Sequence, residues 1–82
     1  MSGFHYVYTL ESLAVPRETY TGQTTDLRRR LTEHNSGKVH HTSKYRPWTI
    51  RSATAFRDPN RALAFERYLK TGSGRAFLHR HL

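Results

Sequence analysis

Cysteine is absent from the 82-residue sequence, which excludes a disulfide framework and a thiolate zinc site. Long apolar runs are also missing: none approaches the roughly 18 residues that span a bilayer, and the N-terminus lacks the basic-then-apolar pattern of a secretion signal. Acidic residues are few, with six Asp and Glu against fourteen Lys and Arg. We therefore expect a soluble, cytoplasmic protein with no membrane partner.

The short length limits the architecture to one domain, residues 1–82. A chain of this size buries only about 60–65% of its unfolded surface on folding. The sequence contains no internal repeat and no low-complexity segment. We expect one thin hydrophobic core with no covalent or metal support.

Positive charge dominates and is unevenly distributed. The formal net charge is +8, with −2 over residues 1–26 and +10 over residues 27–82. Such a surplus on a small body attracts polyanions, either nucleic acid or an acidic membrane surface. Basic membrane helices usually set Trp, Phe and Leu opposite a basic face, whereas the arginines here are scattered over several segments. The charge therefore favours nucleic acid as the partner.

Aromatic and β-branched residues predict three strands. Residues 4–10 alternate in character and form the first. A short second strand over residues 19–22 ends at Gly22, and the intervening loop is too short for a helical crossover, so the pair is antiparallel. Residues 47–56 form the third strand.

Capping residues mark the helices. Residues 27–35 lie between the candidate caps Thr24-Thr25-Asp26 and the stop Gly37, and residues 38–46 read as a basic polar loop. The next helix starts at Asp58-Pro59 and runs to about residue 70, and residues 74–81 form a final helical turn or two. The order β-β-α-β-α predicts an α+β fold, a small three-stranded antiparallel sheet flanked by helices.

Ionisable residues occupy faces of both helices that should be apolar. Glu66 lies on the inward stripe of the second helix, and Arg30 and His34 lie one turn apart on that of the first. A buried carboxylate requires a compensating cation or donor. Glu66 is thus either an edge-of-core residue paired with an arginine or a metal ligand. Together the two stripes predict a polar cleft beside the core.

Five sequence blocks, in this order, resemble the GIY-YIG nuclease family over nearly the whole chain. They are Tyr6-Val7-Tyr8, Tyr20-Thr21-Gly22, Asp26-Leu27 with Arg30, His34-Asn35-Ser36-Gly37, and Ala62-Leu63-Ala64-Phe65-Glu66. The likeness is to the small single-domain bacterial type, and the chain is similar also to the N-terminal nuclease domain of the excision-repair subunit UvrC.

The resemblance implies a metal-dependent endonuclease acting on DNA through one metal ion. The catalytic residues that it implies are Tyr8, Tyr20, Arg30, His34 and Glu66. Glu66 corresponds to the ligand of Mg²⁺ or Mn²⁺, and Tyr8 to the general base. Arg30 would supply a positive charge that persists at any working pH and a planar guanidinium that can bind two phosphate oxygens. A phenol, with a pKa of about 10, serves as a base only if cations lower that pKa or a hydrogen bond shares its proton. His34 and Tyr20 would orient phosphate or water.

Structural roles are the alternative for several residues. The tyrosines could be ordinary strand aromatics, and Tyr6 and Trp48 are expected in the core. The histidine pairs at 40/41 and 79/81 lack further ligands at suitable spacing, so we expect them to be solvated or to contact phosphate.

The sequence departs from the family pattern at three points. Tyr6 replaces a common Gly, Thr21 replaces Ile or Val, and no Asn follows Asn60, whereas several members place one near the active site after the last helix. A nucleic-acid-binding module with little or no activity is therefore the alternative function. DNA is expected rather than RNA, and a protein partner is not indicated. The expected nucleic-acid contacts are Arg28, Arg29, Lys38, Lys44 and Arg46.

Overall fold

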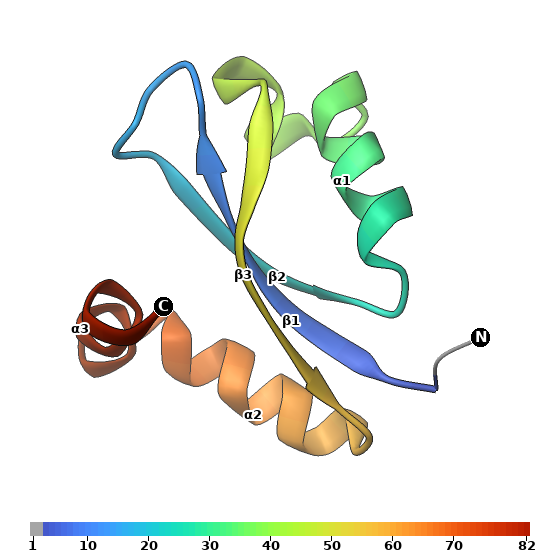
Figure 1. Ribbon diagram of the computed structural model, residues 1–82, viewed down its shortest axis with the longest axis vertical. Helices are drawn as coiled ribbons and strands as arrows, with labels where there is room; N and C mark the ends of the chain where they lie inside the picture. The colour runs from blue at the N-terminus through green and yellow to red at the C-terminus, as the bar shows by residue number, and fades with distance from the viewer. Residues whose placement is uncertain (1–2) are drawn as a thin grey trace.

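The computed structural model describes residues 3–82, which form one three-stranded antiparallel sheet in the order β2-β1-β3 with helices on both faces (Figure 1). The strands are β1 (His5–Ser12), β2 (Thr19–Thr24) and β3 (Trp48–Phe56). The helices are α1 (Leu27–Ser36), the 3-10 helix η1 (His40–Tyr45), α2 (Pro59–Leu69) and α3 (Gly72–His81). The predicted α+β class and the antiparallel sheet are confirmed. No helix within these residues is both long and apolar enough to cross a membrane.

Side-chain caps begin the first two long helices as the sequence predicts. The Asp26 carboxylate accepts from the Arg29 N–H at 3.0 Å, and Asp58 accepts from the Asn60 N–H at 2.8 Å. Helix α1 ends at Gly37, whose φ of 86° lies in the left-handed region.

Three expectations about the elements were wrong. Strand β2 continues past Gly22 to Thr24, the segment 38–46 contains η1, and the C-terminal segment is the full ten-residue helix α3. The Thr71 hydroxyl caps α3 by accepting from the Gly74 N–H at 3.1 Å. A Cβ at residue 74 would lie 1.7 Å from the Tyr68 carbonyl oxygen, so glycine is required where α3 folds back tightly against the end of α2.

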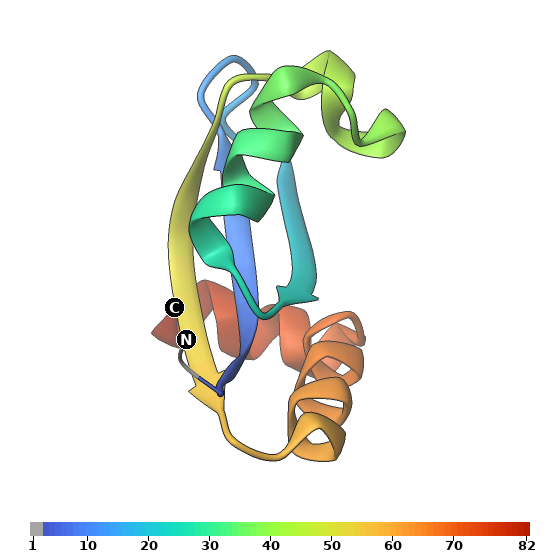
Figure 2. The ribbon, with the colours of Figure 1, turned by 90° about the vertical axis from the view of Figure 1, so that its right-hand side faces the viewer.

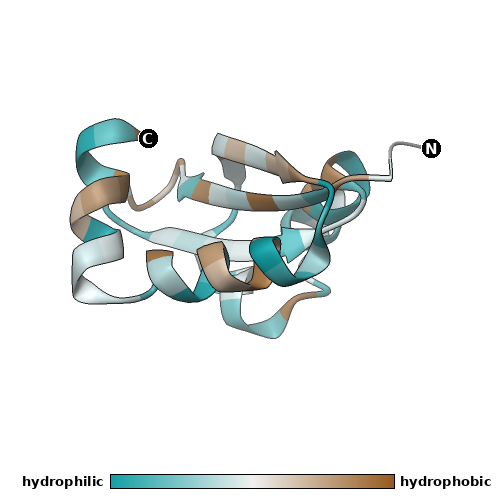
Figure 3. Cartoon of the chain, turned by 90° about the horizontal axis from the view of Figure 1, so that it is seen from below, coloured by the Kyte–Doolittle hydropathy of each residue, from teal (hydrophilic) through white to brown (hydrophobic). Residues whose placement is uncertain are grey.

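Alternation along β1 builds a core on each face of the sheet. Val7 packs under α2 and α3 with Ala62, Leu69 and Leu78. On the other face, under α1 and η1, the buried cluster consists of Tyr8, Leu10 and Trp48. Figure 2 shows α1 in front of the sheet and α3 behind it, and in Figure 3 hydrophobic bands alternate along the strands. Trp48 is 3% exposed, as expected, but Tyr6, also expected in the core, is only partly buried.

Candidate active site at the edge strand

Gly22 gives the Tyr8 phenol room against the edge strand β2. The two residues lie directly opposite each other in the β1–β2 pairing. A Cβ at Gly22 would lie 2.7 Å from Tyr8 Oη and 2.9 Å from Tyr20 Cε2. Within residues 3–82 the glycines of positive φ are Gly3 and Gly37, so space, not backbone conformation, requires glycine at position 22. Gly22 is therefore not the strand-end residue that we expected.

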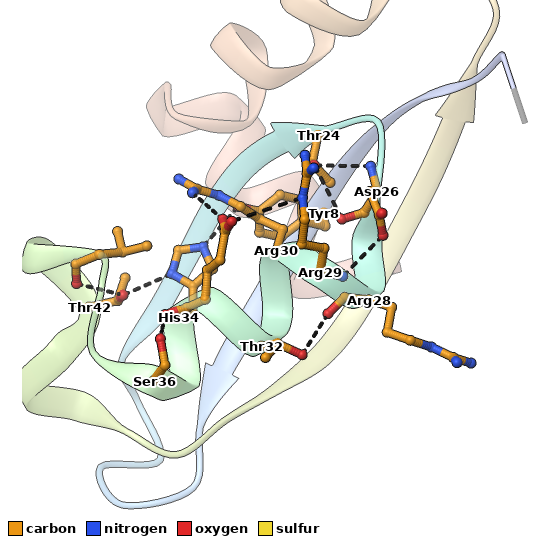
Figure 4. A network of polar contacts seen from close by, with 12 residues as sticks. Tyr8, Thr24, Asp26, Arg28, Arg29, Arg30, Thr32, His34, Ser36 and Thr42 are labelled. Atoms are coloured by element: carbon orange, nitrogen blue, oxygen red, sulfur yellow. Dashed lines mark hydrogen bonds and ion pairs between the residues drawn. The ribbon is translucent and has the colours of Figure 1, made fainter. Parts of the chain in front are cut away.

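The Tyr8 hydroxyl begins a buried hydrogen-bond chain (Figure 4). Tyr8 Oη lies 2.9 Å from His34 Nε2, and His34 Nδ1 lies 2.8 Å from Thr42 Oγ1. The Thr42 hydroxyl donates to the Val39 carbonyl at 3.3 Å. A carbonyl can only accept, and we assign the direction of the whole chain from this last bond. His34 donates from Nδ1 to the Thr42 oxygen, and its Nε2 accepts the proton of Tyr8.

Burial sets the charge states in this chain. It lowers the pKa of His34 below the ordinary value, and the nearby Arg30 cation adds to that effect. Burial raises the pKa of Tyr8, outweighing the opposing influence of Arg30. His34 is therefore neutral at pH 7, and the Tyr8 phenol keeps its proton while sharing it with His34.

Arg30 carries positive charge to the rim of the site. Its side chain is 35% exposed, and its Nη1 lies 2.9 Å from Glu33 Oε1. Glu33, with a smaller contribution from Tyr8, raises the pKa of Arg30, so the guanidinium stays charged. Ion pairs that solvent reaches contribute little to stability. A phosphate oxygen can therefore replace Glu33 at Arg30 with little loss.

Glu66 reaches the same strand from the opposite face of the sheet. Gln23 follows Gly22 and so points towards α2, where its Nε2 donates to Glu66 Oε1 at 3.0 Å. Lys70 Nζ lies 2.9 Å from Glu66 Oε2, and the Glu66 side chain is 17% exposed. The cation that compensates Glu66 is therefore Lys70, where the structural interpretation expected an arginine.

The structure brings four of the five candidate catalytic residues into one cluster and sets the fifth beside it. The Tyr20 ring centroid lies 4.9 Å from that of His34 and 6.3 Å from that of Tyr8. Arg30 and Glu66 both act on the pKa of the Tyr8 phenol, in opposite directions. The step from Gly22 to Gln23 along β2 joins the two faces. The polar residues therefore lie at an edge of the sheet, whereas the two helical stripes predicted a cleft beside the core.

Glu66 fits a divalent cation that keeps most of its water. Within residues 3–82 no cluster of three or more His, Cys, Asp or Glu side chains could hold a metal ion. Mg²⁺ nevertheless binds proteins through one or two carboxylates with several waters retained. The Glu66 carboxylate has about four lone-pair sites, and Gln23 and Lys70 each occupy one. Lys70 is 53% exposed and can move aside.

The residues expected to contact nucleic acid lie on the α1 and η1 side of the sheet. All five are exposed: Arg28, Arg29, Lys38, Lys44 and Arg46. Lys44 lies over the Tyr45 ring at 5.2 Å, and Arg46 Nε donates to the Ser43 carbonyl at 2.7 Å. These contacts orient the Lys44 and Arg46 side chains, which remain exposed to solvent.

Thr42 and Gln23 belong to the site but were not among the candidates. Gln23 has a detectable signal, because strand alternation sends the residue after Gly22 to the face that carries Glu66. Thr42 has none, since η1 brings its hydroxyl to His34 and the sequence predicted a loop there.

The fold and the site define a small α+β domain with polar residues gathered at the edge of an antiparallel sheet. The sequence model described as the GIY-YIG catalytic domain matches residues 4–78. The chain belongs to the GIY-YIG family, and the resemblance drawn from its motifs is confirmed.

Individual relatives match parts of the chain. The structure-specific endonuclease subunit SLX1 of Candida dubliniensis is 45% identical over 53 residues, 57% of this chain and 18% of that protein. A UPF0213 protein of Streptococcus pyogenes serotype M3 is 49% identical over 41 residues, 50% of this chain and 42% of its own length. The chain thus spans less than half of these curated relatives.

A solved structure agrees with the fold over nearly the full chain. The solution NMR structure of a UPF0213 protein from Bacillus halodurans is 32% identical, covers 94% of this chain and 83% of its own, and superposes with a TM-score of 0.57. The three-stranded sheet with its helices is therefore shared with this relative.

Proposed function

We propose that the chain is a divalent-metal-dependent endonuclease that hydrolyses phosphodiester bonds in DNA by a one-metal mechanism. One observation carries the proposal: β2 joins the Tyr8–His34 pair and Arg30 on one face with the Glu66 carboxylate on the other. Family membership and the printed function of the Candida relative, a structure-specific endonuclease subunit, support the same class of reaction.

Tyr8 and His34 act together as the proton acceptor. The Tyr8 oxygen accepts a hydrogen bond from the attacking water. As the water attacks phosphorus, its proton passes to Tyr8 Oη and the original phenol proton passes to His34 Nε2. The products are a neutral phenol and an imidazolium that still donates to Thr42, so no free phenolate forms. Tyr8 is 2% exposed, so the site must open for the water to reach its hydroxyl.

Arg30 and Glu66 hold the phosphate and its charge. Arg30 exchanges Glu33 for a non-bridging phosphate oxygen and stabilises the negative charge that develops in the transition state. Glu66 holds the cation while Gln23 fixes the orientation of the carboxylate. When bound there, Mg²⁺ or Mn²⁺ supplies Lewis acidity to the phosphate and the leaving 3′ oxygen.

The test is a nicking assay on supercoiled plasmid and branched DNA, with RNA of the same branched design, in Mg²⁺ or Mn²⁺. Glu66→Gln, Arg30→Ala and Tyr8→Phe should each lower the cleavage rate by about 10²–10³-fold, as expected for lost transition-state stabilisation. Arg61→Ala is the matched control, because it removes an arginine that is 80% exposed on α2 and has no assigned contact with substrate. If the wild type binds DNA but cuts no substrate faster than Glu66→Gln, the nuclease proposal fails.

A binding module without significant activity is the second candidate. The observation that favours it is that both Glu66 oxygens already have protein partners, Gln23 and Lys70. In that case Glu66 supports the fold and binds no cation. Mn²⁺ titration followed by paramagnetic broadening of amide resonances separates the two candidates. Broadening around Glu66 that is absent from Glu66→Gln supports the nuclease, and equal spectra support the binding module.

A further inference from the structure

A polar cavity lies on the sheet face that carries α2 and α3. It has a volume of about 590 Å³ and lies between β2 and α3, close to the β1–β2 loop, which is on the same side of the molecule as α3 in Figure 1. Its lining residues are Arg17, Glu18, Thr19, Tyr20, Thr21, Arg51, Leu69, Lys70, Arg75, Leu78 and His79. None of the five nucleic-acid contacts expected from the sequence lines it.

The cavity concentrates more positive than negative side chains. Four cationic side chains, Arg17, Arg51, Lys70 and Arg75, face one carboxylate, Glu18. Over residues 3–82 the three arginines form no ion pair with an Asp or Glu side chain. Arg51 uses only its Nε, which donates to the backbone oxygen of Leu82 at 3.3 Å, so its terminal nitrogens remain available. Cations gathered from four separate segments around one cavity indicate an anion as the ligand.

The rest of the lining indicates a ligand larger than an ion. Leu69 and Leu78 are 2% and 8% exposed and give the cavity an apolar wall, while Thr19 and Thr21 add hydroxyl groups. The volume falls in the range of about 300–1,000 Å³ typical of small-molecule sites. A nucleotide matches this lining, with its sugar and base against the leucines and its phosphate between Arg51 and Arg75.

Two residues connect the cavity with the candidate active site. The Tyr20 ring packs against His34 with 4.9 Å between centroids, and Lys70 pairs with Glu66 at 2.9 Å. A cation at Glu66 would release Lys70 to the cavity, where its ammonium could meet a phosphate. A nucleic-acid strand with one phosphate at Arg30 can therefore continue past the edge of β2 into the cavity.

We propose that this cavity binds a nucleotide of the substrate strand next to the scissile phosphate. The inference rests on the proposed nuclease function and extends it, because it assigns the second face of the sheet to substrate binding. Nucleic acid then contacts both faces, the α1 and η1 surface on one and the cavity on the other, with the cleavage site at the edge between them.

Binding of a labelled short oligothymidylate, followed by fluorescence anisotropy over a range of salt concentrations in a chelator, tests the proposal. The double variant Arg51→Gln/Arg75→Gln should bind more weakly. The slope of log K against log salt should fall by about 0.7, since the two arginines hold one phosphate and each single-strand phosphate contact contributes about 0.7. The matched control is Arg57→Gln/Arg61→Gln, which removes the same charge at the other end of α2. Equal slopes in the two double variants overturn the proposal.

Further measurements keep the result interpretable. The single variant Arg75→Gln, at an exposed position, should show part of the same change in slope even if Arg51→Gln affects folding. Titration of the wild type with thymidine monophosphate and with inorganic phosphate, followed by amide chemical shifts, distinguishes the ligand. Tighter binding of the nucleotide at Thr19, Thr21 and Leu78 supports the proposal, and equal affinities reduce the cavity to a plain anion site and overturn it. Binding is measured without metal, so this test applies even if no substrate is cut. If DNA is cut but the Arg51→Gln/Arg75→Gln variant binds like the wild type, the cavity proposal fails and the nuclease proposal does not.

Discussion

Thr42 determines the direction of the buried chain that joins it to His34 and Tyr8. Thr42→Val keeps the shape of the side chain but removes the hydroxyl, which leaves the His34 Nδ1–H buried without an acceptor. An unsatisfied buried donor costs about 1–3 kcal/mol. In a domain of 60–100 residues each kcal/mol lowers the melting temperature by about 4–8 °C. Tyr8→Phe removes the other partner of His34 and should cost a similar amount.

The coupling between the two substitutions is the sharper test. Once Tyr8 or Thr42 loses its hydroxyl, the other hydrogen bond to His34 is no longer polarised by it, and the His34 tautomer is no longer fixed. The double variant should therefore be less destabilised than the sum of the single variants, by at least about 0.5 kcal/mol. Trp48 is the only tryptophan in the sequence and is 3% exposed, so its fluorescence reports urea unfolding directly.

If the destabilisation of the double variant equals the sum of the two single variants within about 0.3 kcal/mol, the two hydrogen bonds of His34 are not coupled and the reasoning is wrong. Thr42→Ser serves as the control, because it keeps the hydroxyl and removes only a methyl group. It should retain the coupling to Tyr8 while costing about 0.5–1.5 kcal/mol of its own. Loss of the coupling in Thr42→Ser as well would indicate that packing, not the hydroxyl, connects these residues.

Three further predictions concern the same site. Burial lowers the pKa of His34 in the folded state, so the unfolded state binds more protons as the pH falls below about 6.5. The stability that this histidine provides above that pH is therefore lost below it. The melting temperature should fall less steeply with acidification in His34→Gln than in the wild type. Gly22→Ala places a methyl group where the buried phenol lies and should cost about 1–3 kcal/mol, whereas an unchanged melting temperature contradicts the close fit. Glu33→Gln frees Arg30 for phosphate and should tighten DNA binding about two- to fivefold. The charge-matched Asp58→Asn, which keeps a capping side chain, should tighten DNA binding less. Equal effects of the two substitutions would show that only the net charge matters.

The local signals in the sequence were sufficient for most elements because each depends on nearby residues. Asp26, Asp58 and Gly37 mark helix ends through bonds to backbone groups within a few residues. The α3 helix was underestimated because its two glycines read as breakers. Its true start is the Thr71 cap, and Gly74 is demanded by contact with Tyr68, a neighbour only once α2 and α3 have folded together.

The sequence by itself determined that polar groups on two helices face inward, because helical periodicity places Arg30, His34 and Glu66 on the buried stripes whatever the fold. It also determined the family, through the order of the tyrosine, arginine and glutamate blocks. Only the tertiary structure decided that these groups meet at the Gly22–Gln23 step, that Lys70 compensates Glu66, and that the Thr42 hydroxyl orients His34. Those contacts join residues up to 43 positions apart, and such pairings depend on how the helices dock on the sheet, which no local pattern records.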